Sequence, residues 1–203
     1  MGLLLLTFGL LTTSGVYASL SAQATGTETV TSGTLNLALS ADTGAGFSAF
    51  AAKMAPGDTD NIYVNLTNTG TLSTAAGMRL WVSAVPASPL SNGVAPGEGL
   101  TVRLTKCSLA WTMASGTCSG ATTVLLAARQ MSTMNSLATA RALAGIPAMA
   151  AGGGVAHVQI SLGLVGTEKS VNGTPPVRTI QANAATLTYS FIEQQRVGIA
   201  TEH

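Results

Sequence analysis

The sequence contains few charged residues. Asp, Glu, Lys and Arg make up 8% of its 203 residues and leave a formal net charge of +1, whereas a soluble domain usually carries about 25% charged residues. Nucleic-acid binding requires clustered Lys and Arg to neutralise phosphates, so this composition excludes a nucleic-acid-binding module. It also excludes a coiled coil and a highly charged disordered tail.

Residues that build metal and catalytic sites are also scarce. The chain has two cysteines and two histidines, His157 and the terminal His203, whereas a structural zinc site takes four Cys or His ligands at short spacings. The His-Glu-x-x-His and Gly-x-Ser-x-Gly motifs are absent, and Gly152–Gly154 lacks the Lys that follows a phosphate-binding loop. We therefore expect no metal, no cofactor and no enzymatic activity. We expect His157 to be a surface residue or a hydrogen-bonded residue of the fold.

A calcium site is the alternative reading of the acidic residues. Asp42, Asp58 and Asp60 are the densest carboxylates in the chain, and calcium prefers oxygen ligands. Asp58 and Asp60, however, follow the turn-forming Pro56-Gly57, where Asp commonly caps its own backbone. We therefore expect turn capping at this position.

The sequence has one strongly apolar run, Leu3–Leu11, which is too short to span a bilayer as a permanent helix. It is followed by the small-x-small pattern of Val16 and Ala18, which is typical of the cleavage region of a secretory signal peptide, although no Lys or Arg precedes the run. We predict a signal peptide over residues 1–18, cleavage after Ala18, secretion, and membrane contact only during export. A second small-x-small site at Ala22–Ala24 leaves the position of the cut open, and a buried N-terminal strand or helix is the alternative to export.

Ala, Gly, Thr and Ser make up half of the chain, and 46% of its residues are hydrophobic. The hydrophobic residues fall in short runs that alternate with polar residues, the pattern of half-buried strands. Seven such runs, separated by turn residues, predict an all-β fold, an antiparallel β-sandwich over residues 32–196. The runs are Ser32–Leu39, Asn61–Leu66, Met78–Val82, Leu100–Leu104, Thr122–Leu126, Val155–Leu162 and Ala185–Phe191.

Residues 127–151 depart from this alternation. Met131, Met134, Leu137 and Arg141 recur at helical spacing and are followed by the helix-stopping Pro147. The pattern predicts a helical insertion between two strands. We interpret its methionines as packing against the sandwich and not as ligands.

The two cysteines, Cys107 and Cys118, lie 11 positions apart in the chain. In an exported protein, an isolated pair at this spacing indicates a disulfide that closes a short loop.

Four separated motifs follow one another along nearly the whole chain. They are the boundary Gly15–Ala18 followed by Ser32-Gly33-Thr34-Leu35-Asn36-Leu37, the turn Met54–Thr59, the strand and turn Val64–Leu72, and the closing strand Leu187–Gln194. In order and spacing they resemble the TasA and camelysin family of secreted, fibre-forming biofilm matrix proteins. The segment from Pro86 to Gly154 resembles no pattern of that family.

The resemblance implies a jelly-roll-like sandwich whose subunits join head to tail by donor-strand exchange. The processed N-terminal segment, residues 19–31, would complete the sheet of the next subunit, with Ser19, Leu20, Ala22, Ala24 and Val30 as its docking residues. The partner is then a second copy of the chain, with other matrix or cell-wall components as further candidates. Two positions depart from the family pattern: Asn36 stands where Asp is frequent, and Leu20 stands where an aromatic residue is frequent.

Two other functions compete with the fibre subunit. A monomeric surface adhesion or binding module would use the loop Pro86–Gly99 and the insertion as its recognition surface. A secreted hydrolase rests only on the family association, because the chain has no zinc-binding motif.

Overall fold

Strands account for most of the structure. The computed structural model describes residues 33–35, 37–41, 54–93, 99–165 and 183–195. The chain divides into two units, Met1–Ser32 and Gly33–His203, and all described residues belong to the second. In chain order they form β1 (Leu37–Ala41), β2 (Thr59–Asn68), β3 (Thr74–Val85), α1 (Pro89–Asn92), β4 (Leu100–Cys107), β5 (Trp111–Thr112), β6 (Thr117–Cys118), β7 (Thr122–Gln130), the 3₁₀ turns η1 (Met131–Met134) and η2 (Leu137–Thr139), β8 (Arg141–Leu143), β9 (Gly154–Leu164) and β10 (Thr186–Gln195).

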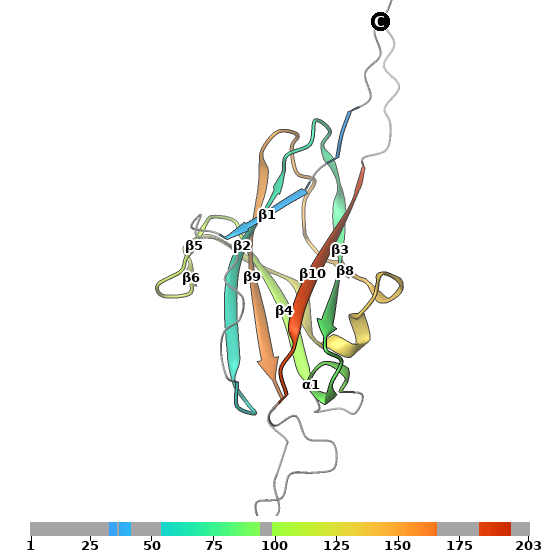
Figure 1. Cartoon of the computed structure of the whole chain (residues 1–203). Coiled ribbons are helices and arrows are strands. Elements are labelled where there is room, and N and C mark those ends of the chain that lie inside the picture. The colour runs from blue at the N-terminus through green and yellow to red at the C-terminus, as the bar shows by residue number, and fades with distance from the viewer. Residues whose placement is uncertain (1–32, 36, 42–53, 94–98, 166–182, 196–203) are drawn as a thin grey trace, which may run out of the picture. The chain divides into compact units, whose positions relative to one another are not determined.

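The strands form two main sheets and one small hairpin (Figure 1). A five-stranded sheet has the order β1-β2-β9-β4-β7, a three-stranded sheet has the order β10-β3-β8, and β5 pairs with β6. Every pairing is antiparallel. The predicted all-β antiparallel fold is therefore confirmed, and each of the seven predicted strands overlaps a strand of the structure.

The core lies between the two main sheets and follows from the alternation of the strands. Even-numbered residues of β2 and β9 point inward. In the register of these adjacent strands, Val64 lies beside Val158 and Leu66 lies beside Ala156. They join inward-facing residues of β3, β4 and β7 in one hydrophobic cluster. Burial of a Val or Leu side chain stabilises a fold by about 1.5–3 kcal/mol. The fully buried members are Leu66, Leu80, Val82, Val102, Leu104, Met134, Val158 and Ile160.

A tight turn leads into β2. The backbone N–H of Asp58 donates to the carbonyl of Ala55 over 2.9 Å, and the N–H of Ala55 donates to Oδ2 of Asp58 over 2.7 Å. Gly57 has φ +99°, a conformation that L side chains rarely adopt. Asp58 caps its own turn, as expected from the Pro-Gly sequence beside it.

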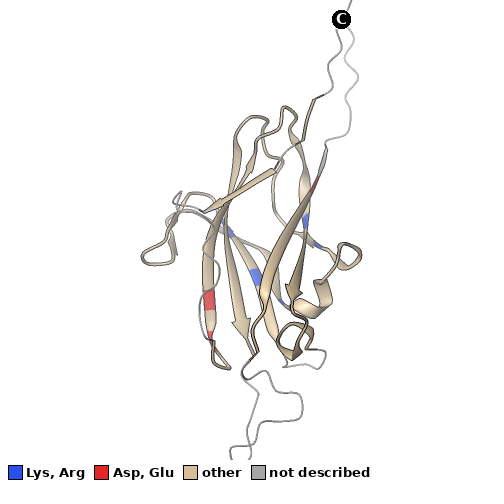
Figure 2. Cartoon of the chain, viewed as in Figure 1, with Lys and Arg blue, Asp and Glu red and all other residues tan. Residues whose placement is uncertain are grey.

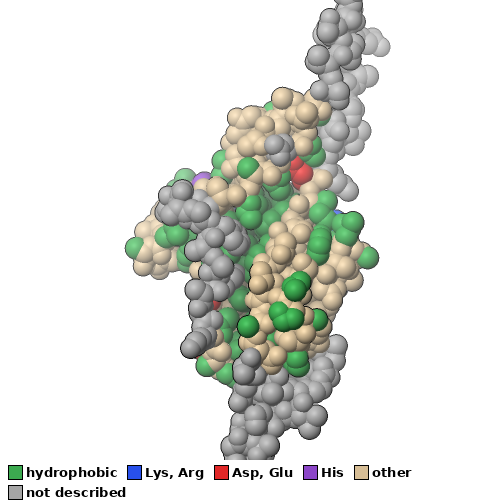
Figure 3. Space-filling view, viewed as in Figure 1, with side chains coloured by type: hydrophobic (Ala, Val, Ile, Leu, Met, Phe, Trp, Pro, Cys, Tyr) green, Lys and Arg blue, Asp and Glu red, His purple; other side chains and the backbone are tan. Residues whose placement is uncertain are grey.

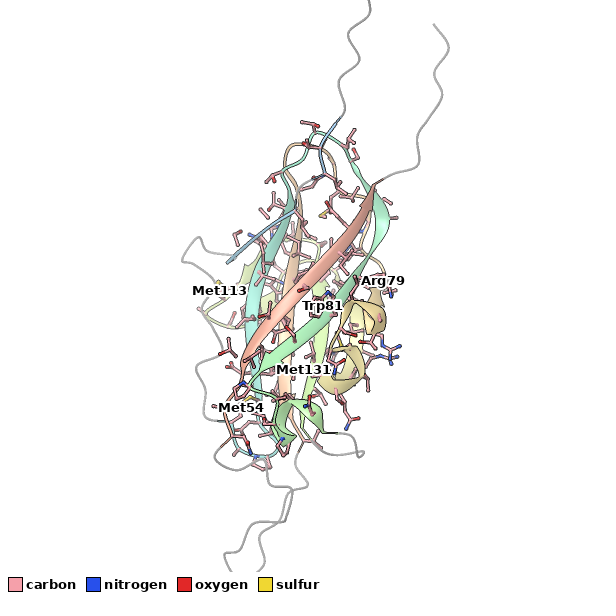
Figure 4. The ribbon with its side chains drawn as sticks, turned by 45° about the vertical axis from the view of Figure 1, so that its right-hand side comes forward. Met54, Arg79, Trp81, Met113 and Met131 are labelled. Atoms are coloured by element: carbon pink, nitrogen blue, oxygen red, sulfur yellow. A yellow bond between two sulfur atoms is a disulfide. The ribbon has the colours of Figure 1, made fainter. Side chains whose placement is uncertain are left out.

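The helical insertion predicted for residues 127–151 is present only as the two 3₁₀ turns. β7 continues to Gln130, and Met131 (Figure 4) and Met134 then lie one 3₁₀ turn apart, both buried in the core. A 3₁₀ helix repeats every three residues, so this pair has the same spacing in sequence as one face of an α-helix. The methionines pack in the core as interpreted from the sequence.

The rest of that segment adds a short strand to the three-stranded sheet. β8 pairs with β3, with Leu143 opposite Met78 and Arg141 opposite Leu80. Arg79 of β3 extends toward this segment, and its Nη2 donates to the carbonyl of Ala140 over 2.8 Å (Figure 4). A strand of three residues carries too little alternation to be recognised in sequence. Helices of the described residues have at most four residues, and none is long and apolar enough to cross a bilayer.

Candidate functional site

The inward face of β10 is incompletely covered. Tyr189 and Phe191 of β10 lie opposite Val82 and Leu80 of β3 in register. Val82 and Leu80 are fully buried, whereas Tyr189, Phe191 and also Leu187 are only half-buried. All five side chains face the core, but those of β10 are less buried than those of β3. β10 therefore lies at the margin of the sandwich, where its apolar side chains are partly accessible to solvent.

The five-stranded sheet has matching half-buried residues on the same margin. Leu37 of β1 and Ile62 of β2 pack against the core without being fully enclosed. Figure 3 shows a groove between β2 and β10 with hydrophobic side chains along its floor. In the described part of the chain, β10 has β3 as its only neighbour and β1 has β2. The backbone edge of each strand that faces away from its neighbour therefore has no strand paired to it among these residues.

The strands that border this groove carry acidic groups and no basic ones. β2 contains Asp60 and β10 contains Glu193, while β1, β2 and β10 contain no Lys or Arg. Figure 2 shows the positive charges on other strands. Both carboxylate oxygens of Glu193 lack a hydrogen-bond partner, and burial raises the pKa of this carboxyl above its ordinary value.

Tyr189 lies on the same inward face of β10. Burial of its phenol raises the pKa of Tyr189 well above its ordinary value, and the negative charge of Asp60 adds to the shift. The phenol is therefore neutral at physiological pH. The groove thus combines an apolar floor with a phenol hydroxyl and two carboxyl groups on its bordering strands.

The outer face of the five-stranded sheet is polar and hydrogen-bonded across strands. Odd-numbered residues of β2 and β9 point outward and pair directly in register. Oγ of Ser161 donates to Oδ1 of Asn61 over 2.5 Å, Nε2 of Gln159 donates to the hydroxyl of Tyr63 over 3.2 Å, and Nδ1 of His157 lies 2.6 Å from Oδ1 of Asn65. His157 is therefore a hydrogen-bonded residue of the sheet, one of the two roles expected from its sequence context.

A disulfide-closed hairpin covers one end of this polar face. Cys107 and Cys118 form the predicted disulfide, with their Cα atoms 5.8 Å apart. Trp111 of β5 packs on Tyr63 with ring centroids 5.3 Å apart, and its Nε1 donates to the carbonyl of His157 over 3.4 Å. Trp111 is 8% exposed, so the hairpin and the sheet form one packed unit there.

The remaining sequence-predicted site residues fall into two groups. Asp58 and Asp60 each accept a local backbone N–H, from Ala55 and Asn61 respectively, and the described residues contain no cluster of three metal-ligating side chains. Asp42, the cleavage residue Ala18 and the docking residues Ser19, Leu20, Ala22, Ala24 and Val30 lie outside the described residues.

Sequence reasoning missed both the groove and the polar face. The alternation in Asn61–Leu66 and Val155–Leu162 shows which side chains share a face. It does not show that the two strands are neighbours, because β2 and β9 are separated by more than eighty residues. The exposure of β10 depends on which strands join it in the three-stranded sheet. The local sequence of β10 does not show this, because its neighbours come from other parts of the chain. Comparison with protein-family models and with curated protein sequences finds no match to this chain.

Proposed function

We propose that the chain is a structural subunit of an extracellular protein fibre, in a biofilm matrix or at a cell surface. Subunits join head to tail when residues 19–31 of one copy dock in the groove between β2 and β10 of the next. The observation that carries the proposal is the half-buried apolar face of β10 beside a strand edge that lacks a neighbour among the described residues. An extended segment added there would gain main-chain hydrogen bonds and bury this face.

The composition of residues 19–31 supports this occupant. Leu20, Ala22, Ala24 and Val30 occupy even-numbered positions, and every odd-numbered position is Ser, Thr or Gln. In an extended strand the even positions share one face, so the segment would present these four apolar side chains, together with Gly26 and Glu28, to the groove and its polar uncharged side chains to water. Thirteen extended residues span about 43 Å, enough to run along the whole of the ten-residue β10.

The same proposal includes export, cleavage after Ala18 and a jelly-roll arrangement of the sandwich. A head-to-tail contact between a terminal segment and a groove generates a filament when successive copies do not close into a ring. The segment and the strands that border the groove contain no Lys or Arg. Assembly should therefore depend little on salt, because main-chain bonds and apolar contacts are not screened by ions.

The test compares the chain 19–203 with the chain 32–203 by electron microscopy and light scattering. The longer chain is expected to form fibres. The shorter chain is expected to stay monomeric and to bind a synthetic peptide of residues 19–31, but not the same peptide with its order scrambled. Fibres of unchanged morphology from the chain 32–203 would refute donor-strand assembly, and persistent monomers of the chain 19–203 would favour the monomeric adhesion module.

A matched pair of variants tests the position of the groove. Leu187→Asp places a charge on the inward face of β10, and Thr188→Asp places the same charge at the next, exposed position. We expect the first substitution to abolish peptide binding and the second to preserve it. Equal peptide binding by both variants would mean that the segment does not dock on the inward face of β10.

A further inference from the structure

A hollow of about 220 Å³ lies on the outer face of the five-stranded sheet, on the opposite face from the groove. The residues that line it come from β2, β4, β7 and β9, and on β2, β4 and β9 they alternate with the inward-facing core residues of the same strands. The lining residues are Thr59, Thr101, Arg103, Ala128, Ser161 and Gly163.

The hollow exists because small residues occupy its centre. Gly163 of β9 lies in register between Thr59 of β2 and Thr101 of β4. A Cβ atom on Gly163 would lie 2.8 Å from Oγ1 of Thr101, so any side chain there would fill the floor. Ser161, the next outward residue of β9, lies in register beside Arg103. The hollow therefore lies between the two threonines and the arginine.

Among the described residues that line the hollow, Arg103 is the only charged one. It is exposed, and it forms no hydrogen bond or ion pair within the described residues. Thr59, Thr101 and Ser161 place three hydroxyl groups around it. The hydroxyls of Thr101 and Ser161 already donate, to the carbonyl of Gly163 and to Oδ1 of Asn61, so their oxygens are left to accept hydrogen bonds from a ligand. One guanidinium surrounded by hydroxyls is suited to a ligand with a single negative charge and several hydroxyl groups.

We propose that this hollow binds one sugar-acid unit, a hexuronate, with its carboxylate on Arg103 and its ring hydroxyls on Thr59, Thr101 and Ser161. A guanidinium and a carboxylate are both planar and form two parallel hydrogen bonds. The volume lies below the roughly 300–1,000 Å³ of pockets for drug-sized ligands, which fits one ring with the rest of a chain lying outside. A phosphate, with up to two charges, would have only one cation here and no helix N-terminus among the lining residues.

This inference is independent of the proposed fibre function. The groove uses the inward, even-numbered residues of β2, whereas the hollow uses the outward residue Thr59. A filament of such subunits would repeat the hollow once per copy, so weak single sites would together hold an acidic polysaccharide by multivalency.

The test measures binding of galacturonate and of its neutral counterpart galactose to the full secreted chain by calorimetry, with inorganic phosphate as a third ligand. Galacturonate is expected to bind and galactose to bind at least about tenfold more weakly, since hydrogen bonds to a charged group are lost. Tighter binding of phosphate than of galacturonate, or equal binding of the two sugars, would overturn the proposal.

Three variants localise the site. Arg103→Gln is expected to weaken galacturonate binding about tenfold or more, and Gly163→Ala is expected to do the same by filling the floor. Arg129→Gln removes an equal charge from an exposed position of β7 that does not line the hollow, and it should leave binding unchanged. Thermal unfolding confirms that each variant is folded. Unchanged binding by Arg103→Gln, or an equal loss in Arg129→Gln, would place the ligand elsewhere and refute the assignment.

Discussion

Replacement of Asn68 by Ala should destabilise the fold by about 3 kcal/mol. Asn68, the last residue of β2, is completely buried. Its Nδ2 lies 2.9 Å from the carbonyl of Leu72, 3.2 Å from that of Met149 and 3.1 Å from that of Ala150, and its Oδ1 accepts from the N–H of Gly70 over 3.0 Å. One side chain therefore joins the β2–β3 turn to the loop that precedes β9.

The magnitude follows from the number of bonds that this amide can make. An NH₂ group has two hydrogens, so its three carbonyl contacts amount to two full hydrogen bonds, and the bond from Gly70 is a third. A buried hydrogen bond contributes about 1 kcal/mol net, which gives about 3 kcal/mol for the three. With a urea m-value of about 2 kcal/mol/M, the unfolding midpoint should fall by about 1.5 M.

Asn68→Asp separates hydrogen bonding from packing, because Asp has nearly the same shape as Asn. It lacks the two N–H donors and directs a carboxylate at three carbonyl oxygens, so it should destabilise more than Ala at pH 7. Burial beside these oxygens raises the folded-state pKa of the new carboxyl above its unfolded value of about 3.9. Stability of this variant relative to the wild type is therefore greatest below pH 4 and is lost as the pH rises through the folded-state pKa.

Urea unfolding of the wild type, Asn68→Ala and Asn68→Asp at pH 3.5 and pH 7 checks both statements. The outcome that refutes the reasoning is a loss below about 1 kcal/mol for Asn68→Ala, because it would mean that water replaces the amide at no cost. A loss for Asn68→Asp that does not change with pH would show that the carboxylate turns away from the carbonyl cluster.

Two further predictions concern the hairpin and the groove. Reduction of the Cys107–Cys118 disulfide, which closes a loop of sequence separation 11, should lower the free energy of unfolding by about 3 kcal/mol through chain entropy; identical urea midpoints for oxidised and reduced wild-type protein would contradict this. Glu193→Gln should stabilise the fold at pH 7 but not below pH 4, because the raised pKa of Glu193 favours the neutral form in the folded state and this stability is lost as the pH rises. Thermal unfolding at both pH values checks it, and an equal gain at the two pH values would count against burial of the carboxylate.

The strands could be predicted because their signal is local. In β2 and β9 the alternation of polar and apolar residues alone assigns Val64, Leu66, Val158 and Ile160 to one face, and all four are buried. The disulfide could also be predicted from the sequence, since two cysteines allow only one pairing. The capping role of Asp58 follows from the Pro56-Gly57 turn beside it.

The features that escaped prediction depend on partners far apart in the chain. In the sequence, Asn68 is a single polar residue before a Thr-Gly turn. Two of its hydrogen-bond contacts are with Met149 and Ala150, which lie 81 and 82 residues further along the chain. Met131 and Met134 have a spacing that both a 3₁₀ turn and an α-helix satisfy. β8 is held by pairing with β3 and by the hydrogen bond from Arg79 to Ala140. Neither contact can be predicted from the sequence of β8 itself.

The low charge of the chain has different consequences on the two faces of the five-stranded sheet. On the inward side, β1 and β2 border the groove without a single cation, so residues 19–31, whose only charged residue is Glu28, can dock there without desolvating a Lys or Arg, a step that costs free energy. On the outward side, the scarcity of charge leaves Arg103 without a carboxylate partner among the described residues, and its guanidinium is available to a ligand. Because successive residues of a strand point to opposite faces, substitutions at Arg103 and at Leu187 should affect ligand binding and assembly separately. A variant that loses both properties through either substitution alone would show that the two faces are coupled.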